Sequence, residues 1–277
     1  MKQTLIAYTA FLILALSLVA CQNTSANNPP MPQFNELLVG TDSGIVKIDA
    51  NSGTVTPLGV GGQWFDLHDG KIYSAKKDWT TVEVFDLSGN TIKTITHPYF
   101  HAVGIVVVGD NLIALLDNDA NKVQFIDMSG SLVHWVSFAG DPSSAQNMDG
   151  VVVGNRLVVS EDGKKRVFYV DLDDYSSGTI ADLSGISATW LSGIAYYAGT
   201  YYTGADDSHV YKFAEGGEPT LLATIIDAPV SGMELGNGYL YATVFHTGKV
   251  YKIDLADGAV TLLASGLSRP ENIRAIP

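Results

Sequence analysis

The 277-residue sequence has a single cysteine, which excludes a disulfide framework and any metal cluster built from several thiolates. Basic residues are also scarce: 16 Lys and Arg stand against 29 Asp and Glu, giving a net charge of −13. Nucleic-acid binding needs clustered cations, so we expect no nucleic-acid partner. Charged residues make up only 16% of the chain and hydrophobic residues 46%, a balance that argues for a packed domain and against intrinsic disorder.

The N-terminal segment has the pattern of an export signal. Residues 5–20 are almost entirely apolar, a run of about 16 residues that is shorter than the roughly 20 needed to span a bilayer. The run ends in Leu18-Val-Ala-Cys21, which resembles the lipobox of bacterial lipoproteins. The resemblance implies cleavage before Cys21, lipid modification of that residue, and an anchor in the bacterial cell envelope. The protein would face the periplasm or the cell surface, with the outer membrane favoured in a Gram-negative cell.

Three segments are therefore expected along the chain. Residues 1–20 are predicted to form the signal peptide, residues 21–33 the lipidated Cys and a flexible, Pro-rich tether, and residues 34–277 the folded domain. The net negative charge opposes adsorption to an anionic lipid surface, so the lipid anchor is the only membrane contact that we expect. We expect the folded domain to be a monomer.

The folded domain contains a repeat of about forty residues. Short β-rich runs alternate with Gly, Asn, Asp and Ser, and no stretch has a helical period. Six related segments end at Asp49, Asp86, Asp127, Asp171, Ala214 and Asp254, at intervals of 37, 41, 44, 43 and 40 residues. A period of about 41 residues with four strands per unit is typical of a β-propeller blade. The sequence thus predicts an all-β, six-bladed β-propeller with four antiparallel strands in each blade.

One unit shows the four strands most clearly, as runs at 104–108, 112–116, 122–127 and 132–138 with turn residues between them. Its order of residues resembles the NHL repeat, and the period of that repeat covers about residues 34–277. Residues 36–58 supply only three strands, and residues 270–276 have the pattern of a lone first strand. We therefore expect the C-terminal strand to complete the N-terminal blade and close the ring.

Residues at the starts of the first strands should surround the mouth of the central channel. In such a blade these strands line the channel, and the connections between blades share one face with the turns between second and third strands. A flat indole at the mouth could stack on a sugar or another ring ligand, although packing between blades is an alternative role for these aromatic residues. The predicted ligand-binding residues are Trp64, His101, Asn147, Trp190, Ser192 and Asn272.

Acidic residues gather on the same predicted face, and their oxygen atoms suit Ca²⁺. Turn geometry and solvation are the alternative explanation for acidic residues in these tight loops. The sequence also resembles the gluconolactonase and regucalcin-like propellers, whose divalent metal lies at the channel mouth. That resemblance implies Glu271 and Asp149 as metal ligands, with Ca²⁺ as the expected ion. It places the third ligand position on Ser192, which is a poor ligand for a hard cation.

These features leave functions of different classes open. The first is a membrane-anchored envelope lipoprotein whose propeller binds a protein, glycan or small-molecule ligand without catalysis. The alternative is a metal-dependent hydrolase of the lactonase type, and a third possibility is a subunit of an envelope assembly. The sequence has no complete catalytic motif of the common hydrolase classes, which favours the first. The fold alone does not decide among them.

Overall fold

The computed structural model describes residues 29–117, 122–138, 147–161, 165–227 and 229–277, without the side chains of Asn147 and Met148. Two compact units are distinguished, Met1–Pro30 and Met31–Pro277, and the propeller is the second of them. Cys21 and the predicted signal peptide lie outside the described residues. Within the described residues, no helix is long and apolar enough to cross a membrane.

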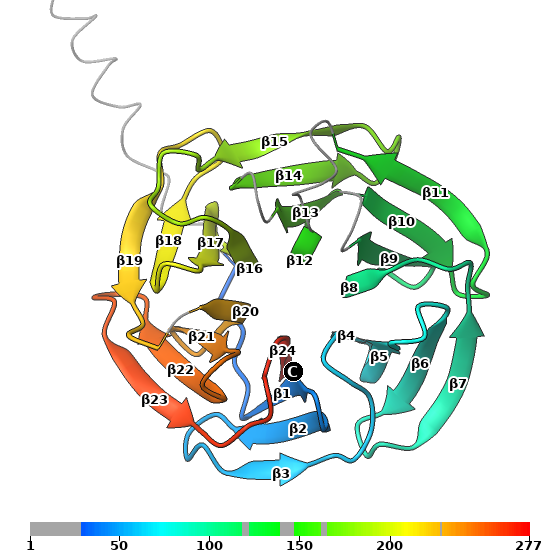
Figure 1. Ribbon diagram of the computed structural model, residues 1–277, viewed down its shortest axis with the longest axis horizontal. Helices are drawn as coiled ribbons and strands as arrows, with labels where there is room; N and C mark the ends of the chain where they lie inside the picture. Colours follow the sequence, from blue (N-terminus) through cyan, green and yellow to red (C-terminus); the bar gives the residue numbers. More distant parts are fainter. Residues whose placement is uncertain (1–28, 118–121, 139–146, 162–164, 228) are drawn as a thin grey trace, which may run out of the picture. The chain divides into compact units, whose positions relative to one another are not determined.

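The described residues of the second unit form an all-β ring of six four-stranded antiparallel sheets (Figure 1). We name the strands of each blade a to d, from the channel outward. The first three blades consist of β24 (Ile273–Ile276), β1 (Glu36–Thr41), β2 (Gly44–Asp49) and β3 (Val55–Pro57); β4 (Phe65–His68), β5 (Lys71–Ala75), β6 (Thr81–Asp86) and β7 (Thr91–Thr96); and β8 (Ala102–Val108), β9 (Leu112–Asp117), β10 (Lys122–Asp127) and β11 (Leu132–Ser137).

Blades 4 to 6 have the same order. They consist of β12 (Asn147–Val153), β13 (Arg156–Glu161), β14 (Arg166–Asp171) and β15 (Ser177–Asp182); β16 (Leu191–Tyr197), β17 (Thr200–Ala205), β18 (His209–Phe213) and β19 (Thr220–Thr224); and β20 (Val230–Gly236), β21 (Tyr239–Val244), β22 (Lys249–Asp254) and β23 (Val260–Ala264). The predicted six-bladed β-propeller is confirmed.

The repeated aspartate has a local physical cause. In blade 3, Asp127 ends the c strand, and its Oδ1 accepts hydrogen bonds from the backbone N–H groups of Ser129 at 2.8 Å and Ser131 at 3.0 Å. The Ser129 hydroxyl, which also donates to Oδ1, and these backbone bonds lower the pKa of Asp127. An aspartate that satisfies the amides of its own turn stabilises the reversal from strand c to strand d. The same arrangement recurs at Asp49, Asp86, Asp171 and Asp254.

The two ends of the propeller meet in the first blade, as predicted. Strand β24 pairs antiparallel with β1, in a register that matches Ile276 with Glu36 and Ile273 with Val39. The pairing extends beyond the strand, because the Gly40 N–H donates to the Asn272 carbonyl at 2.9 Å and the Glu271 N–H donates to the Gly40 carbonyl at 3.0 Å. This closure fixes the residues just before β24 against the first blade.

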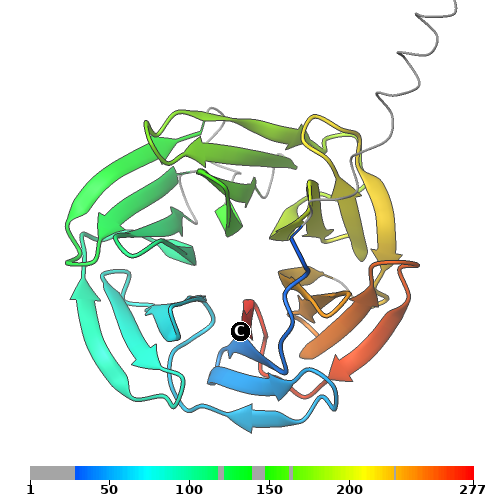
Figure 2. The same cartoon turned by 180° about the vertical axis from the view of Figure 1, so that it is seen from behind.

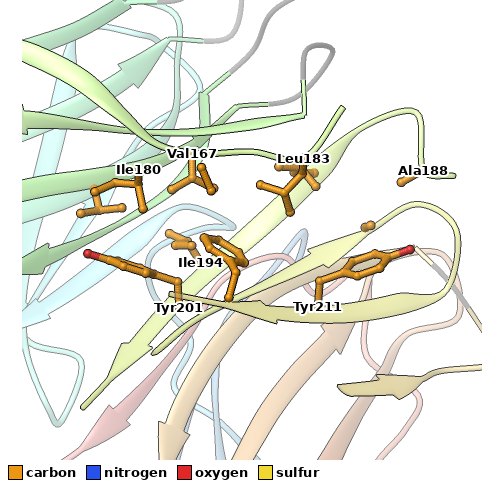
Figure 3. Close-up of a cluster of buried hydrophobic side chains, with 12 residues drawn as sticks. Val167, Ile180, Leu183, Ala188, Ile194, Tyr201 and Tyr211 are labelled. Atoms are coloured by element: carbon orange, nitrogen blue, oxygen red, sulfur yellow. The ribbon is translucent and has the colours of Figure 1, made fainter. Parts of the chain in front are cut away.

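The hydrophobic core lies between neighbouring blades. Between blades 4 and 5, for example, Val167 and Ile180 face Ile194, Tyr201 and Tyr211 (Figure 3). Burying such aliphatic and aromatic side chains contributes roughly 1.5–3 kcal/mol each. Every blade contact therefore helps to hold the ring, and the a strands are fixed around the channel.

The N-terminal segment joins the ring on the face of the a–b turns. Asn237, in the a–b turn of blade 6, accepts a hydrogen bond from the Phe34 N–H at 3.0 Å and donates from its side-chain amide to the Phe34 carbonyl at 2.8 Å. The Asn237 N–H donates to the Pro32 carbonyl at 2.9 Å, and the Phe34 ring packs on Tyr241. Seen from behind, the blue segment crosses the near side of the ring (Figure 2).

Candidate functional site

The opposite face carries a cavity of about 540 Å³ at the mouth of the channel. Residues from d–a connections and from b–c turns line it together, as predicted for the two kinds of loop. Its volume falls within the range of about 300–1,000 Å³ usual for small-molecule sites. The lining residues are Trp64, Lys77, Trp79, His101, Val103, Asp149, Trp190, Pro229, Ser231, Gly232, Phe245, His246, Glu271 and Asn272.

Most of the predicted site residues meet in this pocket. Trp64, His101, Trp190 and Asn272 line it, as do the predicted metal ligands Glu271 and Asp149. The structure therefore brings together residues from the starts of five a strands, which are far apart in the sequence.

Ser192 and Asn147 differ from the other predicted ligand-binding residues. Ser192 is not among the lining residues, because its side chain is 1% exposed and its hydroxyl donates to the backbone carbonyl of Val230 in the next blade. The predicted ligand role of Asn147 concerns a side chain outside the described residues. Ser192 thus joins two blades, and the pocket is built without it.

Lys77, Trp79 and Phe245 line the pocket from b–c turns and were not predicted from the sequence. Trp79 is notable because its backbone has φ 61°, the left-handed region that non-glycine residues rarely occupy. Such conformations persist where the surrounding structure holds them, and they cluster at functional sites. The sequence did contain a signal for these two aromatic residues. A tryptophan or phenylalanine is unusual in a short polar turn, because a turn exposed to solvent gives a large apolar side chain nothing to pack against.

Trp79 lies between two other aromatic side chains of the wall. Its ring centroid is 5.5 Å from that of Trp64 and 4.2 Å from that of His101, with the latter pair at 65°. The Phe100 N–H donates to the Trp79 carbonyl at 2.9 Å, which ties this turn to the start of blade 3. Aromatic pairs of this geometry contribute about 0.5–1.5 kcal/mol beyond the area they bury. The wall formed by blades 2 and 3 is thus preformed.

Glu271 is a part-buried carboxylic acid in this wall. Burial raises its pKa to about 7, although a hydrogen bond from the Trp64 side chain acts in the opposite direction. Gln63 Nε2 also donates to Glu271 Oε1 at 3.2 Å. The side chain is therefore near half-protonation at neutral pH, where it can either accept or donate a hydrogen bond.

Asn272 adds an unsatisfied polar group beside it. The residue is 7% exposed, and its Oδ1 atom is one of two buried side-chain polar atoms without a hydrogen-bond partner among the described residues. Leaving such an atom unpaired costs about 1–3 kcal/mol. Because Asn272 lines the pocket, its amide has hydrogen-bonding capacity that a ligand can use.

Beside the pocket, two cations share one carboxylate, that of Asp42. Lys77 Nζ donates to Asp42 Oδ1 at 3.2 Å, and Arg269 Nη1 lies 3.6 Å from Asp42 Oδ2. Each cation also covers an aromatic ring of the wall, Lys77 over Trp64 at 5.7 Å and Arg269 over Phe245 at 4.2 Å. Asp42 thus holds both cations beside the pocket.

Below the pocket, Arg274 crosses the channel. Its Nε donates to Asp66 Oδ1 at 2.8 Å and its Nη2 donates to Asp149 Oδ1 at 2.9 Å, and all three side chains are at most 12% exposed. Burial alone would lower the pKa of this guanidinium, but the carboxylates of Asp149, Asp66 and Glu234 outweigh burial and raise it. Arg274 is therefore cationic at every accessible pH.

The three carboxylates come from alternate blades and follow one pattern. Each accepts a hydrogen bond from the backbone of the next blade's a strand, whose inner edge has no neighbouring strand to pair with. Asp66 Oδ2 accepts from Val107 N at 2.7 Å, Asp149 Oδ2 from Ile194 N at 3.4 Å, and Glu234 Oε2 from Ala275 N at 3.2 Å. Blades 2, 4 and 6 thus each satisfy a backbone donor of the following blade.

This charged layer separates the pocket from a second cavity. That cavity of about 230 Å³ is lined by later residues of the a strands, including Val151, Ala195 and Leu235, together with Arg274 and Glu234. Burial raises the pKa of Glu234, against the nearby Arg274 charge. The channel is thereby divided by a layer in which one guanidinium faces three carboxyl groups.

The donors at the channel mouth do not fit a lactonase-type metal centre. Asp149 is already bound to Arg274, and Ser192, at the third ligand position, donates its hydroxyl to a backbone carbonyl. No group of three or more His, Cys, Asp and Glu among the described residues is arranged to hold a metal ion. Ca²⁺ binding by Glu271 and Asp149 stays a prediction, and no reaction step is derived from it.

No protein-family model and no curated protein matches the chain. Solved structures do match, at low sequence identity. A chain of a nidogen/laminin complex has a TM-score of 0.66 and 14% identity, covering 86% of this chain and 97% of that one. The virginiamycin B lyase of Staphylococcus aureus has a TM-score of 0.61 and 16% identity, covering 76% of this chain and 73% of that one. A streptogramin B lyase has a TM-score of 0.63 and 13% identity, covering 88% of each chain. These similarities define the class as a β-propeller and show the fold alone.

Proposed function

We propose that this chain is a membrane-anchored envelope lipoprotein whose propeller binds a small ligand in the pocket at the channel mouth, without catalysis. The observation that carries the binding function is a shared pocket: Trp64, Trp79, Trp190 and Phe245 line it together with Asn272, whose buried Oδ1 atom has no partner among the described residues. A mostly apolar concavity with a few convergent polar groups is the usual form of a ligand site.

The position of the N-terminal segment supports the anchored arrangement. Residues 31–34 join the ring at the a–b turn of blade 6, while the pocket opens among the d–a connections and b–c turns. These two kinds of loop lie at opposite ends of the a strands. The chain therefore enters the ring on the face away from the pocket.

A hydrolase is the second candidate, and one observation favours it. Glu271 has a pKa of about 7 and shares the pocket with His101 and His246, so it could take or give a proton at neutral pH. The structural neighbours include two lyases and a chain from a protein complex, so a propeller of this kind can host catalysis as well as binding.

A retention experiment tests the binding function even though the ligand is unidentified. Full-length protein in detergent is incubated with the low-molecular-mass fraction of an envelope extract, washed and denatured, and the released compounds are identified by mass spectrometry. We expect a compound that the wild type retains and the Trp190→Ala variant loses. The matched control is Trp135→Ala, because Trp135 lies on β11, is 54% exposed, and does not line the pocket.

Two results would contradict this function. Retention of nothing by the wild type, or equal retention by the wild type and Trp190→Ala, would remove the pocket as a binding site. Conversion of the compound into a product, abolished by Glu271→Gln, would instead establish the hydrolase.

A further inference from the structure

The ligand class follows from the charges of the pocket, and the inference rests on the proposed binding function. The charged side chains at the pocket are Lys77, Asp149 and Glu271. Lys77 donates to Asp42, and Asp149 accepts from Arg274. Glu271 is a weakened counterion at neutral pH, because burial raises its pKa to about 7.

A charged ligand would therefore meet opposite charges that the protein already engages. An organic cation would lie close to Lys77 and Arg269, which already cover the rings of Trp64 and Phe245. An anion would have to compete with Asp42 for those same two cations. Desolvating a charge without a partner costs more than desolvating a neutral polar group, so cationic and anionic ligands are both disfavoured.

A purely apolar ligand is disfavoured as well. It would bring no partner for Asn272 Oδ1, which is already buried and unpaired, and it would cover the Glu271 carboxyl without adding a hydrogen bond, which costs binding energy. The ligand must bring hydrogen-bonding groups to this side of the pocket.

The aromatic side chains of the pocket indicate that the ligand also has an apolar face. Three of the four Trp residues, at 64, 79 and 190, line the pocket together with Phe245. Indole rings offer wide, flat, apolar faces, and they suit a ligand that has a flat or C–H-bearing face.

We propose that the pocket binds a neutral hydroxylated ring, a sugar residue, with one ring face against the indoles and hydroxyl groups on Asn272 and Glu271. Hydroxyls both donate and accept, so they can satisfy the Asn272 amide in either orientation and the Glu271 carboxyl in either protonation state. The cavity of about 540 Å³ leaves room for a free sugar or for the end of a glycan chain.

The test uses intrinsic tryptophan emission and melting temperature of the full-length protein. The probes are glucose, galactose, mannose and N-acetylglucosamine, then oligosaccharides of the same units, with choline and citrate as charged counterparts. We expect at least one neutral saccharide to change the emission and, at a hundredfold excess over its Kd, to raise the melting temperature by roughly 5 °C. Stronger binding of the oligosaccharide than of its free unit identifies a glycan end, and equal binding identifies a free sugar.

Variants assign the response to the pocket. Trp190→Ala and Asn272→Leu should each lower the affinity for the saccharide at least tenfold, whereas Trp135→Ala should leave it unchanged. If Trp190→Ala fails to fold, the nearly isosteric Asn272→Leu variant still shows whether the saccharide binds in the pocket. A response to choline or citrate and to no saccharide would overturn the neutral-ring assignment and leave the binding function standing. If none of the probes binds, the neutral-ring assignment is also overturned. The retention experiment then tests the binding function separately.

Discussion

Arg274 Nη2 donates to Asp149 Oδ1 at 2.9 Å across the central channel, joining blade 1 to blade 4 over 125 residues of sequence. Because these two blades stand opposite each other in a ring of six, the ion pair braces the ring from within. The same guanidinium holds Asp66 of blade 2. Asp149, which lines the pocket, is thus held by a cation that closure of the ring brings into the channel.

Replacing Arg274 by Met should destabilise the whole ring. Breaking a buried ion pair by removing one partner costs about 3–5 kcal/mol, because the remaining carboxylates are left buried and uncompensated. For a domain of this size we expect a fall in melting temperature of roughly 10 °C, measured by calorimetry. Adding Asp149→Asn and Asp66→Asn should recover part of the loss.

The matched control for this variant is Lys71→Met. Lys71 pairs with Asp69 on the surface, where the two side chains are 39% and 72% exposed, so its loss should leave the melting temperature close to that of the wild type. Equal melting temperatures for Arg274→Met and Lys71→Met would show that the charged layer does not brace the channel.

Glu271 should make stability depend on pH. Its pKa is about 7 in the folded protein against an ordinary value of 4.5, so the folded state binds the proton more tightly than the unfolded state. The stability from this group is fully present below pH 4.5 and is lost as the pH rises through 7, by an amount on the order of 3 kcal/mol.

The Glu271→Gln variant isolates this effect. We expect the wild type to melt below the variant at pH 8.5 and the difference to shrink as the pH falls to 5, in parallel thermal scans. A difference that stays constant over this range, or grows toward pH 5, would show that Glu271 does not have a raised pKa.

Gly232 should be intolerant of a side chain. A Cβ atom there would lie 2.2 Å from the backbone carbonyl oxygen of Glu271 and 3.0 Å from the Cα of Asn272. Gly232→Ala should push β20 away from the segment before β24, lowering stability by about 1–3 kcal/mol and weakening binding in the pocket. Gly185→Ala is the control, since a Cβ atom there meets nothing within 4 Å. Indistinguishable denaturant midpoints for the two variants would refute this close approach.

The anchor can be tested separately from the pocket. Cys21 is the only thiol in the chain, so Cys21→Ala should abolish incorporation of a palmitate analogue and move the protein from the detergent phase to the aqueous phase. Ser17→Ala, in the same segment, should retain both properties. Labelling of the Cys21→Ala protein, or a wild-type protein without acyl chains, would rule out the lipoprotein proposal.

The ring could be predicted from the sequence because its causes are local. An aspartate that satisfies its own turn marks the end of the c strand in every blade but the fifth, where Ala214 replaces it and the Gly217 N–H bonds to the Ala214 carbonyl instead. The pairing of β24 with β1 followed from the missing first strand of the N-terminal blade. Position at the start of an a strand was then enough to place Trp64, Trp190 and Glu271 at the channel mouth.

The remaining parts of the site depend on contacts that no local pattern specifies. Trp79 reaches the pocket because its turn adopts a positive φ, and Ser192 turns away because a carbonyl of the next blade takes its hydroxyl. The partnership of Arg274 with Asp149 requires the closed ring, since only closure brings the C-terminal strand across from blade 4. For that reason the sequence did not indicate that a guanidinium lies beside Asp149.

The measurement that tests the central claim most directly is oxidative footprinting of the tryptophans. The full-length protein is oxidised with and without the low-molecular-mass envelope fraction, and modification at each Trp is quantified by peptide mass spectrometry. Occupation of the pocket should protect Trp64, Trp79 and Trp190 and leave Trp135, on β11, as reactive as before. Protection of Trp135 alone, or no change at the other three in a fraction from which the protein retains a compound, would contradict the assignment of this pocket as the binding site.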